Sequence, residues 1–324
     1  MKKCIFLIVI LTLCRCASKH EPVESPESVI RKYEDLFIKN QKSACFQFIS
    51  KASRSNVTYQ EFENLEFPKD TSDFHFISID HIQQIESDTK DSMFKRFKVT
   101  LNLALNNHTF KKVFYRTLVK EGTNWRRIWS KSLLIEAINY IKDRDFTSAV
   151  ELSQKAIDLD PYGGNAYEFL GTAYLGLSDK VRAKNYLDKS IYLEPDMPYH
   201  YFAMSNFYYD KNDIDSAGWF LKKGLQTSTT PYDSITFLTD IGYNFVKKRN
   251  FDSALYNFKQ VLVLDSKNDF AFYQIGKIYY FRRDFFKSFA YLSRVRNKFT
   301  IPEKYQDDYD ATFTHLKSIL KEKN

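Results

Sequence analysis

The sequence predicts an α+β domain followed by an all-α solenoid of helical repeats. Three observations lead to this prediction. Small and turn-forming residues recur every 34 residues through most of the second half of the 324-residue chain. Apolar and polar residues alternate from Phe97 to Leu105, which is typical of a half-buried strand. A nine-residue stretch near the amino terminus, residues 5–13, is almost wholly apolar.

Residues 1–16 have the organisation of an export signal. Two lysines follow the initial methionine, and the apolar stretch over 5–13 is too short to span a bilayer as a helix. A cysteine directly after such a stretch resembles the signal of bacterial lipoproteins, in which the thiol is acylated. The resemblance implies lipidation of Cys16, with Cys14 as the alternative. A cleaved signal without a lipid and an uncleaved anchor are the other interpretations, and all of them predict an exported protein.

The composition of the exported part indicates which bonds, surfaces and ligands to expect. Residues 17–25 are polar and contain a proline, which indicates a tether of modest reach. Beyond Cys16 the chain has one cysteine, Cys45, so no internal disulfide can form. The formal net charge of +8 favours anionic envelope surfaces over nucleic acid in an exported protein. The histidines are scattered and no phosphate-binding loop is present, so we expect neither a metal nor a cofactor.

Residues 26–131 are predicted to form the α+β domain. A helix begins at Ser25-Pro26, because serine caps helices and proline is favoured in the first turn. Two more helices are expected near 41–52 and over 59–65. The hydrophobic period then changes to two, and the expected strands cover 74–85, 97–105, 113–119 and 125–129. Helices followed by an antiparallel meander favour the α+β class.

The closing segment of this domain, Trp125–Leu134, has the sequence WRRIWSKSLL. It resembles the end of the small cone domain at the base of some penicillin-binding transpeptidases. The order of elements is similar to that of the nuclear transport factor 2-like cone, in which a curved sheet surrounds a cavity. The resemblance implies a binding or structural module, or else an acid–base pair like that of cyclases and isomerases. The candidates for such a pair are His75, Asp80, His81, Tyr115 and Arg116.

Residues 132–301 are predicted to contain about five helix–turn–helix repeats. The main repeat markers are Ala149, Ala183, Ala217, Ala254 and Ser288. One such unit cannot bury its apolar face alone, so the units must stack. The second repeat, with the segments AYEFLGTAYLG and RAKNYLDKSIYLEP, resembles the tetratricopeptide repeat family. The resemblance implies a solenoid that binds other proteins, and a capping helix is expected over 302–324.

The resemblance also implies where a partner would bind, because the leading helix of each repeat lines the inner face of such solenoids. Helical spacing places four residues of the third repeat on one face, and equivalent positions in later repeats extend it. The predicted partner-binding residues are Tyr199, Phe202, Asn206, Tyr209, Tyr243, Tyr273, Lys277 and Tyr280. Tyrosine offers a large rigid contact with a polar tip, which suits a protein or peptide partner. The alternative is that these tyrosines partly pack on each other.

The turns inside the repeats become more basic toward the carboxyl end. The last two turns contribute Lys247, Lys248, Arg249, Arg282 and Arg283. Stacking would align them along one edge, which we expect to face anionic lipid headgroups or another anionic polymer, with each near-surface cation contributing about 1 kcal/mol. The alternative is that these turns are simply solvated.

These observations together predict a non-catalytic envelope lipoprotein that acts as an adaptor through the inner face of its repeats. The alternative is an amino-terminal domain that binds a small ligand or catalyses acid–base chemistry, with the repeats as a docking arm. The partner, the membrane leaflet and the oligomeric state stay open at the level of the sequence.

Overall fold

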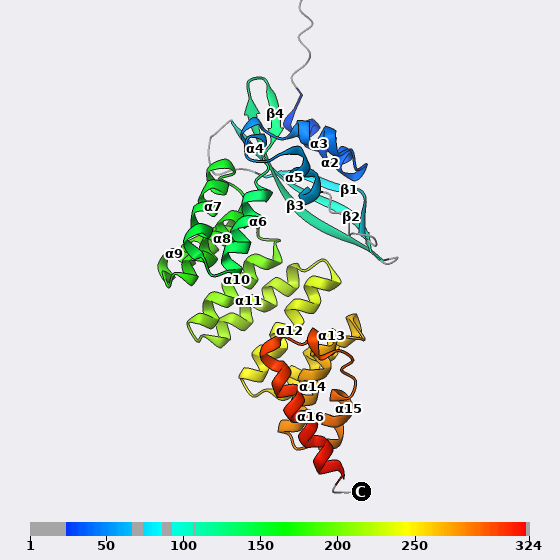
Figure 1. Ribbon diagram of the computed structural model, residues 1–324. Coiled ribbons are helices and arrows are strands. Elements are labelled where there is room, and N and C mark those ends of the chain that lie inside the picture. The colour runs from blue at the N-terminus through cyan, green and yellow to red at the C-terminus, as the bar shows by residue number, and fades with distance from the viewer. Residues whose placement is uncertain (1–23, 67–73, 86–92, 106–107, 322–324) are drawn as a thin grey trace, which may run out of the picture.

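The computed structural model describes residues 24–66, 74–85, 93–105 and 108–321. The predicted signal, both candidate lipidation sites and most of the tether lie outside the described residues. The described chain has two parts, an amino-terminal α+β domain and a long series of helices (Figure 1). Both parts follow the order that the sequence predicts.

Four short helices open the amino-terminal domain: α2 (Pro26–Ile38), α3 (Lys42–Phe48), α4 (Lys51–Arg54) and α5 (Tyr59–Glu66). The Ser25 hydroxyl caps α2 by accepting a hydrogen bond from the Ser28 amide. The prediction of one helix near 41–52 is wrong, because the chain leaves the helical path between α3 and α4. There Ile49 forms a parallel bridge to Arg127, and the Ser50 amide donates to the Arg127 carbonyl at 2.8 Å.

One antiparallel sheet follows, with the strand order β1-β2-β3-β4. The strands are β1 (Phe74–Ile85), β2 (Phe94–Leu105), β3 (His108–Glu121) and β4 (Asn124–Arg127). The turn between β3 and β4 places Gly122 at a φ of 62°, a left-handed conformation that glycine adopts without strain. The four expected strands are therefore confirmed, although β4 ends two residues before the expected end at Trp129.

The two faces of the sheet have different partners. Phe97, Val99, Leu101 and Leu103 of β2 are fully buried and share a core with residues of α2 to α5, such as Tyr33. The intervening residues of β2 point to the opposite face, from which Arg96 and Lys98 reach the end of α9 and the loop after it.

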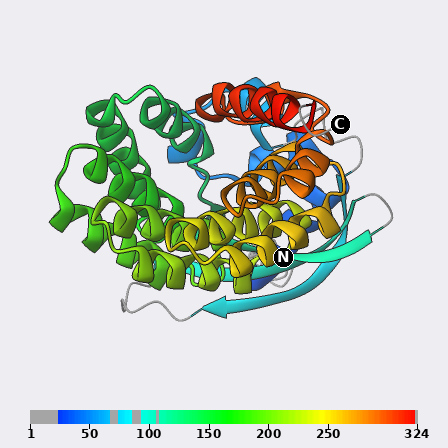
Figure 2. The same cartoon turned by 90° about the horizontal axis from the view of Figure 1, so that it is seen from below.

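Five pairs of antiparallel helices form the solenoid, as the sequence predicts. They are α6 (Lys131–Lys142) with α7 (Phe146–Leu159), α8 (Gly164–Gly176) with α9 (Lys180–Leu193), α10 (Pro198–Asp210) with α11 (Ile214–Thr227), α12 (Pro231–Lys247) with α13 (Phe251–Leu264), and α14 (Asp269–Phe281) with α15 (Phe285–Leu292). Seen from below, the pairs follow an arc from green through yellow to orange (Figure 2).

The repeat markers mark close helix contacts within a pair. A Cβ atom on Gly171 would lie 2.8 Å from Leu187 and 3.0 Å from the carbonyl oxygen of Ala183. Ala183 itself is fully buried. Small residues are therefore required here because the two helices approach each other too closely for larger ones.

The carboxyl-terminal segment folds back onto the last repeats. Two 3₁₀ turns, Lys298–Thr300 and Glu303–Tyr305, precede α16 (Gln306–Lys321). The expected helix start at Pro302 is thus four residues early, because the chain first makes the second of these turns. Tyr309 and Leu316 are the buried apolar residues of α16. Within the described ranges, no helix is both long and apolar enough to cross a membrane.

Candidate functional site

The amino-terminal sheet contacts the solenoid at the end of α9 and the loop after it, residues 194–197, and also at Tyr162 in the loop between α7 and α8, where the Phe94 ring lies 5.8 Å away between centroids. The Tyr115 hydroxyl donates to Asp196 Oδ2 at 2.7 Å, and Lys98 Nζ lies 2.5 Å from the same oxygen. Arg96 donates to the Leu193 carbonyl at 2.9 Å. Because these donors come from two neighbouring strands, the loop is fixed against the sheet at several points.

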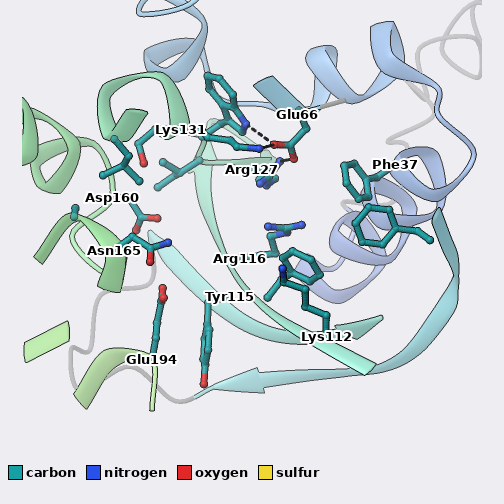
Figure 3. Close-up of a pocket in the computed structure, with 18 of the residues that line it drawn as sticks. Phe37, Glu66, Lys112, Tyr115, Arg116, Arg127, Lys131, Asp160, Asn165 and Glu194 are labelled. Atoms are coloured by element: carbon teal, nitrogen blue, oxygen red, sulfur yellow. Dashed lines mark hydrogen bonds and ion pairs between the residues drawn. The ribbon is translucent and has the colours of Figure 1, made fainter. Parts of the chain in front are cut away.

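A cavity of about 780 Å³ lies beside this contact, between the α+β domain and the first two helical pairs (Figure 3). This volume is within the range of ligand pockets. Its walls come from α2, β3, the segment after β4, α6 and the start of α8. The lining residues that bear on function are Phe37, Lys112, Tyr115, Arg116, Asp160 and Asn165.

One wall of the cavity contains a buried network around Glu66. Arg127 donates to the Glu66 carboxylate at 2.8 Å, Trp129 Nε1 at 3.0 Å and the Tyr33 hydroxyl at 3.0 Å. Burial opposes ionisation of Glu66, but Arg127 and Lys131 outweigh it and hold the pKa of this carboxyl well below its usual range. The network therefore keeps a charged group inside the domain and connects α2, α5 and β4.

The cavity places opposite charges on its two sides. Arg116 and Lys112 project from β3, and the Arg116 Nε atom donates to Glu34 at 2.7 Å. Asp160 and Asn165 lie on the solenoid side (Figure 3). Burial raises the pKa of Asp160 to about 6. The cavity is suited to hold a charged group at either end.

The predicted acid–base residues are not brought together. Asp80 forms an ion pair with Lys111 at 2.9 Å, and His81 is exposed on β1. Tyr115 lies on β3, separated from β1 by β2, and its pKa is raised by burial and by its hydrogen bond to Asp196. The side chain of His75 lies outside the described residues. Among the described side chains, no close pair of Asp80 or His81 with Tyr115 exists, and no cluster of His, Cys, Asp and Glu could hold a metal ion.

The predicted inner face is most accessible in the second and third pairs. Asn206 is exposed, and Thr172 at the equivalent position of α8 is half-buried. Other members pack between pairs: Phe202 contacts Phe237 edge to face with ring centroids 6.0 Å apart. Tyr199 donates to Asp233 at 2.9 Å, and Tyr209 accepts from Asn244 at 3.1 Å. The packing alternative therefore applies to Tyr199, Phe202 and Tyr209, and partner binding by this face stays a prediction.

The inner face of the last two pairs is covered by the chain's own carboxyl-terminal segment. Tyr273 is 3% exposed and donates to Asp308 at 2.5 Å. Lys277 pairs with the same carboxylate at 2.8 Å, and Tyr280 hydrogen-bonds to His315 at 2.6 Å. Tyr243 hydrogen-bonds to Tyr305. The expected continuous trough is therefore interrupted, because α16 and the turn before it lie where a partner would have to bind.

A buried histidine on α10 was missed by sequence reasoning. His200 is fully buried and bonds to Glu168 at 2.7 Å and to Glu194 at 3.3 Å. Burial opposes protonation, but the two glutamates outweigh it and raise the pKa of His200 to about 9. The charged ring joins the second pair to the third. The available signal was a histidine within an otherwise apolar and aromatic helix.

The basic turns are partly neutralised. Lys248 forms an ion pair with Asp215, and Arg282 donates to Asp252 at 2.8 Å. Lys247 instead lies over the ring of Tyr209, 4.5 Å from its centroid. Arg249 and Arg283 are exposed and have φ angles of 56° and 58°. The anionic-surface role of these residues stays a prediction.

Comparison with known proteins identifies part of the solenoid. Residues 164–197, which cover α8 and α9, match the tetratricopeptide repeat family. The second helical pair is a tetratricopeptide repeat. A Drosophila melanogaster BBSome complex member BBS4 homolog is 24% identical over 187 residues, which are 57% of this chain and 37% of that protein. The chain therefore spans little more than a third of the length of this curated relative.

Solved structures of low sequence identity align with part of this chain. Pseudomonas aeruginosa pilF aligns with a TM-score of 0.47 and 14% identity, over 60% of this chain and 90% of that one. The type IV pilus biogenesis factor PilW aligns with a TM-score of 0.47 and 15% identity, over 59% and 92% of the two chains. The resemblance of the amino-terminal domain to the nuclear transport factor 2-like cone stays a prediction.

Proposed function

We propose that the protein is a non-catalytic adaptor of the cell envelope. A lipid on Cys16 holds it at a membrane, the α+β domain orients the solenoid, and the inner face of the second and third helical pairs binds a segment of a partner protein. The observation that carries this proposal is the contrast along the inner face. Asn206 is exposed, whereas the equivalent Lys277 is paired with α16.

The accessible part of the inner face has a defined chemistry. Asn206 offers an amide, and Phe202 and Tyr209 offer half-buried rings. Half-buried aromatic rings beside polar groups are the composition of protein-binding surfaces, where a few aromatic residues contribute most of the affinity. A short partner segment with apolar and amide-bonding side chains fits this surface.

The test introduces charge and bulk on the inner face without removing packing. Thr172→Arg combined with Asn206→Arg should abolish crosslinked capture of a partner from the envelope, because two long cations would occupy the accessible positions. The matched control is Tyr256→Arg, at a position on α13 that is 64% exposed. Equal recovery by both variants would overturn the inner face as the binding surface.

The lipid anchor is tested separately. Metabolic labelling with a fatty acid should modify the native protein, and Cys16→Ala should remove the label. Retention of the label in Cys16→Ala with loss in Cys14→Ala would move the acylated residue to the alternative position. No label on the native protein would overturn the anchor and leave the adaptor role to stand on the capture experiment.

A further inference from the structure

Strand β3 has an edge that is paired over only part of its length. β2 pairs with β3 from His108 to Val119, whereas β4 pairs only with Leu118–Glu121. The pairing on the β4 side ends with the hydrogen bond from the Ile128 amide to the Thr117 carbonyl, at 2.8 Å. Before Thr117, no strand that the structure describes pairs with this side of β3.

The direction of the free backbone groups follows from the alternation of a strand. Successive residues of an antiparallel strand direct their N–H and C=O groups to opposite sides. The Thr117 carbonyl points toward Ile128, away from β2. The backbone groups of Val113 and Tyr115 therefore point the same way, while those of Phe114 and Arg116 point toward β2. Among the described residues, Val113 and Tyr115 have no backbone partner on the open side.

This open edge borders the cavity between the two parts of the molecule. Lys112, Phe114, Tyr115 and Arg116 all line it. Neighbouring side chains on a strand point to opposite faces, so a cavity that touches three successive residues meets the edge of the strand itself. Figure 3 shows the Arg116 and Tyr115 side chains leaving β3 in different directions.

The charged side chains beside the open edge indicate which side chains an added strand would need. Lys112, Phe114 and Arg116 lie on one face of β3, opposite Leu101, Val99 and Phe97 of β2. Lys112 forms no ion pair with any residue that the structure describes. Arg116 uses only its Nε atom for Glu34. On an added strand, side chains facing Lys112, Phe114 and Arg116 would be acidic, apolar and acidic at alternate positions.

We propose that the open edge of β3 binds an extended segment of a partner protein as an added strand, with two acidic residues four positions apart and an apolar residue midway between them. Main-chain hydrogen bonds to Val113 and Tyr115 give the affinity, and Lys112 and Arg116 select the acidic residues. Addition of a strand to a free sheet edge is an established mode of peptide recognition. This surface does not include Thr172 or Asn206 of the inner face, neither of which lines the cavity.

The first test measures binding of the peptide acetyl-Glu-Thr-Val-Thr-Glu-amide to the full chain. Its sequence is the same in both directions, so it fits either strand orientation. We expect it to bind, and the peptide with lysine in place of both glutamates to bind at least tenfold more weakly. Amide hydrogen exchange at Val113 and Tyr115, followed by NMR, should slow at least tenfold in the complex, because these N–H groups gain acceptors. Binding without this protection, or no binding of the acidic peptide, would overturn the proposal.

Matched variants separate this site from others. Lys112→Gln should weaken binding of the acidic peptide several-fold, while Lys111→Gln should not, because Lys111 lies on the other face of β3 and pairs with Asp80. The inner-face variant Thr172→Arg with Asn206→Arg should bind the peptide normally. An equal effect of Lys111→Gln and Lys112→Gln would show a general effect of charge and would overturn the edge as the site.

Discussion

Different kinds of contact stabilise the interior of the α+β domain and the interior of the solenoid. In the α+β domain, Glu66, Arg127 and Tyr33 form one buried polar network between elements far apart in the sequence. In the solenoid, small residues such as Gly171 allow the same close helix contact to recur from pair to pair. The comparison teaches that the domain depends on a few contacts that each occur once, whereas the solenoid divides its stability among many similar ones.

The largest effect is expected from breaking the buried network. Arg127→Leu should destabilise the α+β domain by about 3–5 kcal/mol, because it leaves the carboxylate of Glu66 buried without its main partner. Chemical denaturation followed by the fluorescence of Trp125 and Trp129 measures this loss. If the double variant Arg127→Leu with Glu66→Leu regains most of the stability, the loss is caused by the unpaired buried carboxylate of Glu66. A loss as small as that of Lys111→Ala, which breaks an exposed pair, would contradict it.

The second prediction concerns close packing in one repeat. Gly171→Val should cost about 1–3 kcal/mol, because the added carbon atoms would collide with Leu187 and the backbone at Ala183. Thr172→Val, one residue further along α8, is the control and should change stability little. Circular dichroism during denaturation measures both. A destabilisation that also lowers the α+β transition would show that the two parts do not unfold independently.

The third prediction concerns the charged histidine between two repeats. The pKa of His200 is raised to about 9 in the folded chain, above its unfolded value of about 6.5. Its contribution is therefore complete below about pH 6.5 and is lost as the pH rises through 9. The melting temperature of the solenoid should fall across this window, and His200→Gln should remove that slope. An unchanged slope in the variant would assign the pH dependence to other groups.

The smallest effect is expected at the turns. Arg249 has a φ of 56°, a conformation that costs a non-glycine residue about 1 kcal/mol. Arg249→Gly should thus leave stability unchanged or raise it by less than about 1 kcal/mol, since the gain is offset by the greater freedom of glycine in the unfolded chain. A clear loss of stability would show that the arginine side chain makes a contact that matters.

The sequence predicts the solenoid well because its contacts are local and repeated. Gly171 and Ala183 lie within one unit, so their spacing alone indicates the packing. The Glu66–Arg127 pair could not be found in this way, since an acidic residue at the end of a short helix usually faces solvent. The open edge of β3 could not be found either, because the predicted strands over 113–119 and 125–129 have similar lengths, and the extension of β3 back to His108 is visible only in the structure.

The covering of the last repeats by α16 was also beyond the sequence. The sequence predicts a capping helix over 302–324, but an apolar helix face does not tell which helix it packs on. The polar residues Asp308 and His315 of α16 place this helix on α14 through their hydrogen bonds to Tyr273 and Tyr280. The prediction of a continuous trough failed because these contacts lie at positions that looked equivalent to the accessible ones in α10.

The loop that carries Asp196 has a mechanical consequence. Lys98 and Tyr115 hold it from two adjacent strands, and it lies after the first two helical pairs along the chain. A force applied between the two ends of the molecule would have two routes, one along the covalent chain through α6 to α9 and one across these hydrogen bonds. The second route bypasses the first two pairs, so they would be shielded from tension until the bonds to Asp196 break. The contact of Lys98 and Tyr115 with Asp196 would then break under force before the first two helical pairs unfold.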